Sequence, residues 1–289
     1  MTYIVHGATG AQGSPVLASL LASGHPATAA VRTPANLPDG ATAAAVDLTD
    51  AAALTALYTG ASGVFVHLPL GAPEVAAAQA EAIATAIETA RPARVVISTS
   101  GAIVDQPDSP LQAPEDAPVR RLIRRATESG VSTAIVSPRL YLENLLLPVV
   151  FGPAREAGVL RYPLPADFPV SWSSHLDVAE VVARLLTEDA EARTEGVIAI
   201  GHLPALTGEQ LATEFGAALG HPVRYAALSP AEFGELITPL FGPGAAPVVS
   251  LYEALNAEPG FMISEPTSAQ RVLDLAPRPV ADWLAKMLA

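Results

Sequence analysis

The sequence contains no cysteine and only one lysine, Lys286. Without cysteine the chain has no disulfide, no thiolate metal ligand and no cysteine nucleophile. Because lysine is so scarce, there is also no Tyr-x-x-x-Lys pair, the arrangement in which a lysine lowers the pKa of a tyrosine that donates a proton near neutral pH. A lysine-assisted proton relay is therefore excluded, unless Lys286 folds back from its place near residue 289.

Basic residues are also few. The chain has 16 Lys and Arg against 29 Asp and Glu, which gives a formal net charge of −13. Such a surface repels nucleic-acid phosphates, so we expect no direct binding to nucleic acid. No run approaches the ~18 apolar residues of a membrane span, and the first residues do not resemble a signal peptide. We therefore expect no membrane association and a cytoplasmic location.

Two further classes of site are missing. The six histidines have no H-x-x-x-H or H-E-x-x-H spacing, so no metal site is expected. No G-x-S-x-G turn is present either, which leaves an esterase without a platform for its nucleophile.

Short apolar runs alternate with helical patterns over the first half of the chain, and this alternation predicts a doubly wound α/β fold with a parallel sheet covered on both faces. The expected strands lie near 3–7, 28–32, 42–46, 63–69, 93–99 and 131–137. The expected helices lie near 14–24, 51–60, 73–90, 113–130 and 176–186. The rhythm breaks after about residue 140. We therefore predict a first domain over residues 1–150 and a smaller region over 151–289, with a strand near 197–201 returning to the sheet.

The stretch VHGATGAQGS, from Val5 to Ser14, ends a predicted strand and begins a predicted helix. Its glycines are spaced G-x-x-G-x-x-G, and we expect Ser14 to cap the helix. A helix N-terminus offers free N–H groups to an anion, and glycines let the backbone approach a pyrophosphate. The context predicts a phosphate-binding turn, with an ordinary tight turn as the alternative.

A second marker follows the second predicted strand. A dinucleotide site usually has an acidic residue there to bind the ribose 2′-hydroxyl, whereas this chain has Arg32, 19 positions beyond Gly13. A guanidinium suits a 2′-phosphate, and no carboxylate is nearby to repel it, so the sequence indicates NADP(H). The alternative is a solvated charge. Asp47 and Leu48 are expected to frame the adenine, although Asp47 is equally consistent with a turn or cap residue.

An ordered set of segments resembles the NmrA-like family of atypical short-chain dehydrogenases nearly end to end. The segments are VHGATGAQGSPV, VRTP, VDLTDAAALTALYTGASGVFVHLP, VVISTSG, SPRLYLEN, HLDVAEVVARLL and LTGEQLATEFGAALGHPVRYAALSPAEF. This resemblance implies a Rossmann-type NADP(H)-binding domain with a smaller C-terminal α/β substrate domain. Members of the family are NADPH-dependent reductases of quinones and related compounds, or redox-sensing regulators with little catalysis.

The resemblance also implies roles for individual residues. It implies that the pyrophosphate is bound by Gly7, Thr9, Gly10, Gln12 and Gly13, and the 2′-phosphate by Arg32. The nicotinamide ribose would be flanked by His67, Leu68 and Pro69. The carboxyl end of the fifth strand would be lined by Thr99, Ser100 and Gly101.

Two functions remain open from the sequence. One is an NADPH-dependent reductase that transfers a hydride to a small apolar quinone, activated alkene, imine or carbonyl. The other is a non-catalytic NADP(H)-sensing protein, and a homodimer or a protein partner is compatible with either. The candidate catalytic residues are Tyr141, His67 and Ser100. Each also has a structural interpretation. Tyr141 could pack between the domains, His67 could be a structural histidine with its hydrogen bonds satisfied at the end of a strand, and Ser100 could form hydrogen bonds with backbone groups.

Overall fold

The structure is a computed structural model that describes residues 2–33 and 37–289. Pro34, the last residue of the VRTP segment, lies outside the described residues. The chain forms two compact units. Unit 1 comprises Met1–Pro138 and His175–Ala199, and unit 2 comprises Arg139–Ser174 and Ile200–Ala289. These bounds differ from a division at residue 150, because the segment that follows Ser174 returns to unit 1. The assignment of cofactor and substrate to separate domains stays a prediction.

Unit 1 is built on a sheet with strand order β3-β2-β1-β4-β5-β6-β8, which has seven strands in the described part of the chain. The strands are β1 (Tyr3–His6), β2 (Ala27–Val31), β3 (Thr42–Ala45), β4 (Gly63–His67), β5 (Val95–Ser98), β6 (Thr133–Pro138) and β8 (Gly196–Ile200). The neighbouring pairs from β3 through β6 are parallel. The order reverses between β1 and β4, and this is where ligands bind open parallel sheets.

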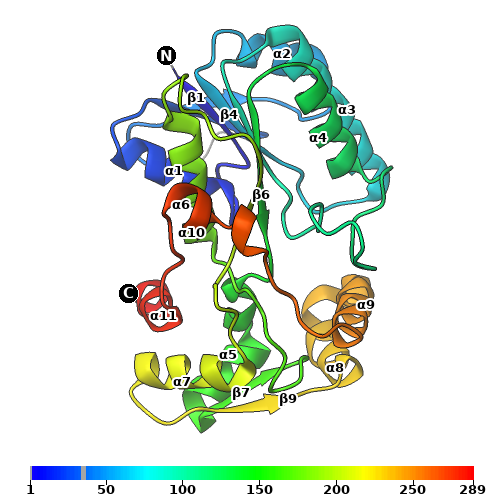
Figure 1. The fold of residues 1–289 in the computed structure, drawn as a ribbon, viewed down its shortest axis with the longest axis vertical. Helices are drawn as coiled ribbons and strands as arrows, with labels where there is room; N and C mark the ends of the chain where they lie inside the picture. Colours follow the sequence, from blue (N-terminus) through cyan, green and yellow to red (C-terminus); the bar gives the residue numbers. More distant parts are fainter. Residues whose placement is uncertain (1, 34–36) are drawn as a thin grey trace. The chain divides into compact units, whose positions relative to one another are not determined.

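Helices cover both faces of this sheet, as predicted. Helices α1 (Gly13–Ala22) and α6 (His175–Thr187) pack together on one face. On the other face α3 (Pro73–Ala90) packs against both α2 (Ala51–Tyr58) and α4 (Pro118–Glu128) (Figure 1). No described helix has the length and apolar character needed to cross a membrane.

The α2–α4 side holds a continuous apolar core. Ile4, Val64 and Ile97 are fully or almost fully buried there against Leu54 and Ile83 of the helices. Strands buried on both faces require continuous apolar sequence, which is why runs such as VVI and VFV form the central strands. Asp50 caps α2 through its carboxylate, which accepts hydrogen bonds from the N–H groups of Ala52 and Ala53 at 3.0 Å.

The expected cap of α1 is wrong. Ser14 lies inside the helix, which begins at Gly13, and its own N–H donates to the carbonyl of Gly10 at 3.0 Å. The residue at the cap position, Gln12, makes no side-chain capping bond, and the first turn contains no acidic residue. No side chain therefore caps the first turn of α1.

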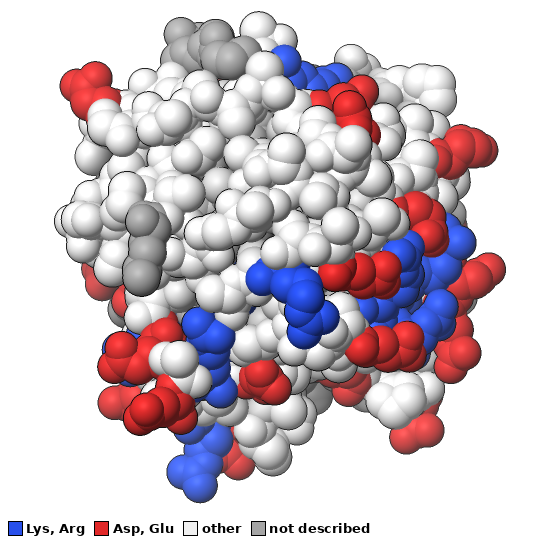
Figure 2. Space-filling view, turned by 90° about the horizontal axis from the view of Figure 1, so that it is seen from above, with Lys and Arg blue, Asp and Glu red and all other residues white. Residues whose placement is uncertain are grey.

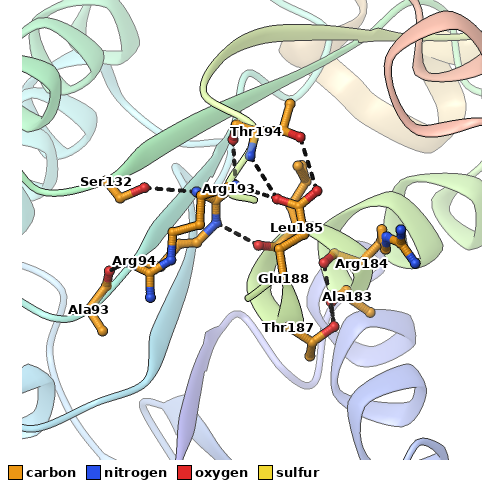
Figure 3. A network of polar contacts seen from close by, with 10 residues as sticks. All are labelled: Ala93, Arg94, Ser132, Ala183, Arg184, Leu185, Thr187, Glu188, Arg193 and Thr194. Carbon is orange, nitrogen blue, oxygen red and sulfur yellow. Dashed lines mark hydrogen bonds and ion pairs between the residues drawn. The ribbon is translucent and has the colours of Figure 1, made fainter. Parts of the chain in front are cut away.

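At the amino ends of the strands, which we call the amino edge, a buried arginine joins three segments (Figure 3). Arg94 directly precedes β5 and is 0% exposed. Its guanidinium donates to the carbonyls of Leu185 and Thr194 and to the hydroxyl of Ser132. It also forms an ion pair with Glu188 at 3.3 Å. Glu188 in turn accepts hydrogen bonds from the backbone N–H and the hydroxyl of Thr194. These contacts fix β5 to the end of α6 and to the segment before β8.

Unit 2 has a two-stranded parallel sheet of β7 (Val159–Tyr162) and β9 (Arg224–Ala227) in the described residues. Its longer helices are α5 (Pro148–Ala157), α7 (Gly208–Leu219), α8 (Pro230–Phe241), α9 (Ala245–Asn256) and α11 (Val280–Leu288), and its short elements are η1 (Leu142–Leu146), η2 (Gly242–Gly244), η3 (Glu265–Thr267) and α10 (Ala269–Leu273). The core is aromatic. The ring of Tyr162 lies 5.4 Å from those of Trp172 and Tyr252 and 5.8 Å from that of Phe233, between ring centroids.

Candidate functional site

The carboxyl ends of β1 to β5, which we call the carboxyl edge, border the candidate site in unit 1. A pocket of about 610 Å³ lies there. The glycine turn, the ends of β2 and β4, the residues after β3 and the first half of α3 form its walls. The lining residues are Gly7, Thr9, Gly10, Ala30, Val31, Arg32, Thr33, Val46, Asp47, Leu48, His67, Pro69, Leu70, Val75 and Gln79. The volume suits a ligand of nucleotide size.

The glycine turn has the backbone that its sequence predicts. Gly7 has φ +59°, a conformation that L side chains rarely adopt, and its carbonyl accepts a hydrogen bond from the N–H of Gly10 at 2.8 Å. A Cβ on Gly13 would lie 2.3 Å from the Gly7 oxygen, so the start of α1 packs directly on the turn. The first turn of α1 has no side-chain cap, so its N–H groups and dipole can receive an anion.

Arg32 and Asp47 occupy neighbouring strand ends in the pocket. Arg32 directly follows β2 and Asp47 lies just beyond β3. The pKa of Asp47 is lowered, first by hydrogen bonds from the backbone and hydroxyl of Thr49 and further by the charge of Arg32. The expectation that no carboxylate lies near Arg32 is therefore wrong. Parallel pairing of β2 with β3 brings the two residues together although 15 positions separate them.

His67, the last residue of β4, contacts the glycine turn. Its Nε2 lies 2.3 Å from the point where a Cβ on Gly7 would stand, so only glycine leaves room for the imidazole. Both ring nitrogens of His67 are buried and have no hydrogen-bond partner among the described residues. Burial lowers the pKa of His67, and the backbone of Leu68 partly opposes this shift.

Two other histidines lie near His67, the fully buried His6 and the partly buried His175. Burial lowers the pKa of His6 to about 3, and that of His175 at the start of α6 to about 4, with a further contribution from His67 in each case. His6 shares a hydrogen bond of 2.6 Å between its Nε2 and the hydroxyl of Tyr58. All three imidazoles are therefore neutral near pH 7. In the described residues no group of His, Asp and Glu forms a metal-binding cluster.

Gln12 connects the glycine turn to the end of β5. Its amide nitrogen donates to the hydroxyl of Ser100 at 3.0 Å, and its carbonyl accepts from the hydroxyl of Ser98 at 2.9 Å. The backbone N–H of Ser100 donates back to the Ser98 hydroxyl. Ser100 has φ +54°, which is rare for a residue with a side chain, and strain of this kind concentrates at functional sites. This network sets the conformation of the loop after β5.

The structure brings together much of the predicted cofactor set. Eight predicted residues line the pocket, namely Gly7, Thr9, Gly10, Arg32, Asp47, Leu48, His67 and Pro69. Gly13, Gln12 and Ser100 instead shape the turn and the loop beside it, and the Thr99 hydroxyl is buried without a hydrogen-bond partner in the described structure. Tyr141 belongs to unit 2, where it precedes η1 and forms a bridge with Ser173. The roles of all these residues stay predictions.

Sequence reasoning missed several residues at this edge. Val75 and Gln79 line the pocket from α3, and their i, i+4 spacing just after the β4 loop was the available signal. Ser98 was missed because its role depends on Gln12, 86 residues away. The pair of His6 and Tyr58 joins a strand end to a helix end, which no local pattern indicates.

Two arginines of α4, Arg121 and Arg125, form ion pairs with acidic residues of α3. Arg125 forms ion pairs with Glu81 at 2.7 Å and with Glu88 at 2.5 Å, and Arg121 lies 3.7 Å from Glu81. Figure 2 shows the same pattern on the face it presents, where basic side chains are interleaved with acidic ones. These ion pairs join α4 to α3.

Comparison with known proteins decides the family. The model of the NmrA-like family matches residues 1–284. The NAD(P)H azoreductase of Xenophilus azovorans is 31% identical over 280 residues, which are 95% of this chain and 91% of that protein. The chain belongs to the NmrA-like family.

Solved structures agree with the fold of this NmrA-like protein. The NADPH-dependent quinone oxidoreductase of Escherichia coli, solved with NADPH, has a TM-score of 0.78 at 22% identity, with full coverage of both chains. The triphenylmethane reductase of Citrobacter sp., solved with NADP(H), has a TM-score of 0.78 at 18% identity, covering 99% of this chain and 100% of the other. At these identities the similarity establishes the Rossmann-type fold.

Proposed function

We propose that this NmrA-like protein is an NADPH-dependent reductase that transfers a hydride to a small, largely apolar acceptor. The observation that carries the proposal is the composition of the carboxyl-edge pocket. The glycine turn, the N-terminus of α1 and Arg32 provide backbone N–H groups and a guanidinium where a dinucleotide phosphate binds in an open parallel sheet. The similarity to an NAD(P)H azoreductase supports the same function.

Each part of the pocket has a role in this proposal. Gly7, Gly10 and the start of α1 hold the pyrophosphate, and Arg32 forms charge-assisted hydrogen bonds with a 2′-phosphate. Asp47 and Leu48 border the adenine, while His67 and Pro69 border the nicotinamide ribose. Bound NADPH supplies the hydride, and the protein positions it and excludes water.

The acceptor follows from what the chain lacks. Without a Tyr-x-x-x-Lys pair, an alcohol–ketone conversion has no activated tyrosine as proton donor. Quinones, azo compounds, activated alkenes and imines place the incoming charge on a heteroatom or a stabilised carbon, so weaker acids suffice. We therefore propose this class of acceptor, with Tyr141 and Ser100 as candidates for contacts to it.

The experiment compares cofactors and variants. Arg32→Ala should weaken NADPH binding at least about tenfold while changing NADH binding little, because an Arg–phosphate contact is worth about 1.5–3 kcal/mol. Titration of protein fluorescence gives both affinities. An exposed arginine of α6, Arg184, provides the matched control Arg184→Ala. Equal losses for both cofactors would remove the 2′-phosphate assignment.

Catalysis is tested on the wild-type protein. NADPH oxidation is followed with a panel of quinones, azo dyes, enones, imines and carbonyl compounds. Turnover with members of the first four classes and little with simple ketones is the expected result. Tight NADPH binding without turnover on any of them would overturn the reductase proposal and favour a cofactor-sensing role.

A further inference from the structure

We propose that binding of the cofactor protonates His67, and that the imidazolium formed in this way is the proton donor for the reduced acceptor. The inference rests on the proposed function, because the charge that acts on His67 is the pyrophosphate of the cofactor. It assigns the proton source that the missing tyrosine–lysine pair leaves open.

The first support is the position of the imidazole. Nε2 of His67 lies 2.3 Å from the point where a Cβ on Gly7 would stand, so the ring packs directly against the phosphate-binding turn. The side chain also lines the pocket together with Thr9 and Gly10 of that turn. A pyrophosphate bound on this turn would meet the residues that the imidazole of His67 contacts.

The second support is that the imidazole has no hydrogen-bond partner in the described structure. Both Nδ1 and Nε2 of His67 are buried, and neither makes a hydrogen bond of standard geometry among the described residues, although the backbone of Leu68 lies near enough to the ring to raise its pKa. A buried polar atom left without a hydrogen bond costs about 1–3 kcal/mol, so such an atom is rare unless a ligand completes it. The imidazole therefore has hydrogen-bonding capacity left for a ligand.

The third support is the set of charges that face His67. Of the titratable groups on packed elements, His6 of β1 and His175 of α6 interact with it. The segment 7–22, which forms the turn and α1, contains no titratable side chain. Arg32 and Asp47 line the same pocket from β2 and β3. Burial lowers the pKa of His67, so the ring is neutral near pH 7 before cofactor binds.

A bound pyrophosphate reverses this balance. It brings two negative charges to the turn, and an opposite charge within ~4–6 Å strongly favours the protonated form of a histidine. Arg32 is the one basic side chain among the described residues that line the pocket, and it stands at the end of β2, where the 2′-phosphate is expected. The negative charge at the turn therefore acts on His67, and a proton is taken up with the cofactor.

The proton then balances the reduction. Bound NADPH supplies the hydride and with it both electrons. The N–H bond of the His67 imidazolium breaks, its electron pair stays on the ring nitrogen, and the proton joins the acceptor nitrogen or oxygen that has received negative charge. His67 returns to neutral imidazole and is protonated again from water when the next NADPH binds.

Calorimetry on the full-length protein tests proton uptake directly. NADPH is titrated into the protein at pH 7 in two buffers of different ionisation enthalpy, and the difference gives the protons taken up. We expect uptake approaching about one proton per NADPH, with the dissociation constant rising by up to about tenfold per pH unit across the range of uptake. In His67→Gln uptake should fall to about zero. His25→Gln, a histidine that precedes β2 at the amino edge, is the matched control and should retain uptake.

Histidine ring NMR on the wild-type protein gives a second readout that does not depend on a variant. With ¹⁵N-labelled histidine, one of the six rings should change from neutral to imidazolium when NADPH is added, and His67→Asn identifies its signal. Absence of NADPH binding to the wild type would contradict the proposed function. Binding without proton uptake, or with uptake unchanged in His67→Gln, would overturn this inference alone.

Discussion

On the amino edge of the unit 1 sheet, the nitrogens of Arg94 all donate to oxygens of three surrounding segments, and the side chain is completely buried (Figure 3). On the carboxyl edge of the same sheet, buried polar atoms of similar hydrogen-bonding capacity have no partner in the described residues. They include both ring nitrogens of His67, the hydroxyl of Thr99 and Nδ1 of His6. The two edges thus differ in whether these buried polar groups have hydrogen-bond partners.

This difference separates stability from function within one sheet. A satisfied buried network holds segments in one arrangement, whereas unpartnered buried groups cost free energy until a ligand binds them. The separation is not complete. At the carboxyl edge Gln12 forms hydrogen bonds with the hydroxyls of Ser98 and Ser100, and at the amino edge Nε of Arg193 has no partner among the described residues. We therefore expect mutations at the amino edge to lower stability with little effect on cofactor binding, and mutations at the carboxyl edge to weaken cofactor binding, whether or not they also lower stability.

The largest expected effect comes from Arg94→Met. The variant removes the cation that pairs with Glu188, whose side chain is 9% exposed, and the Arg94 donor of the carbonyls of Leu185 and Thr194. Removing one partner of a buried ion pair costs about 3–5 kcal/mol, so the urea midpoint should fall sharply. Arg184→Met, on the exposed side of α6, should change the free energy of unfolding by less than about 0.5 kcal/mol. If folded Arg94→Met bound NADPH at least tenfold more weakly, the separation between the edges would fail.

The next effect is expected from Gly7→Ala at the carboxyl edge. The new methyl group would collide with Nε2 of His67, and alanine would have to adopt the φ of +59° that Gly7 has. Together these should lower the free energy of unfolding by about 1–3 kcal/mol. Displacement of the turn should weaken NADPH binding roughly tenfold or more. The control Gly24→Ala has φ +77° but no atom within 4 Å of its new Cβ. It should reduce stability by about 1 kcal/mol and leave cofactor affinity unchanged.

Combining Gly7→Ala with His67→Ala tests whether the collision with His67 or the positive φ causes the loss of stability in Gly7→Ala. If the collision dominates, the double variant should regain part of the stability that Gly7→Ala loses, because the alanine at position 67 makes room for the methyl group. A double variant at least as unstable as the sum of the two single changes would assign the cost to the backbone alone.

The order and type of the unit 1 elements could be predicted from the sequence, because each strand is a short apolar run and each helix is longer and bounded by proline or glycine. The glycine turn and Arg32 could be predicted for the same reason, since their signal is local. The cap of α1 was mistaken because Ser14, a good cap by composition, competes with a turn whose glycines already determine where the helix begins. Local propensity is overridden here because a Cβ at Gly13 would collide with the carbonyl of Gly7, so the tight turn decides where the helix begins.

What the sequence does not reveal is pairing across the sheet. Asp47 lies beside Arg32, and Gln12 reaches Ser98 and Ser100, because parallel strands bring distant residues to the same edge. Arg94 is a similar case, since one arginine before a strand gives no sign that residues 185 to 194 will surround it. These contacts depend on strand order and register, which single-sequence patterns do not specify.

The buried histidines at the carboxyl edge predict a loss of stability in acid. Burial lowers the pKa of His6 to about 3 and of His175 to about 4, below the unfolded value of 6.5. Between these values the unfolded chain binds more protons, so the free energy of unfolding should fall by about 1.4 kcal/mol per pH unit for each histidine as pH drops from about 6.5 to 4. Urea unfolding at several pH values measures the slope. His6→Gln should reduce it, and an unchanged slope would show that groups other than His6 cause the acid sensitivity.

The smallest effect is expected from Asp47→Asn. The Asp47 carboxylate lies near enough to Arg32 for the guanidinium to lower its pKa, so it also repels a 2′-phosphate held by Arg32. An amide keeps the size and can still accept the hydrogen bonds from Thr49. Removing one partly solvated charge is worth about 0.2–1 kcal/mol, so the preference for NADPH over NADH should rise about two- to fivefold. The effect should shrink in high salt, where exposed charges are screened. A fall in the NADPH preference would instead show that Asp47 orients Arg32. The free energy of unfolding should be almost unchanged in either case, because the carboxylate is exposed to solvent.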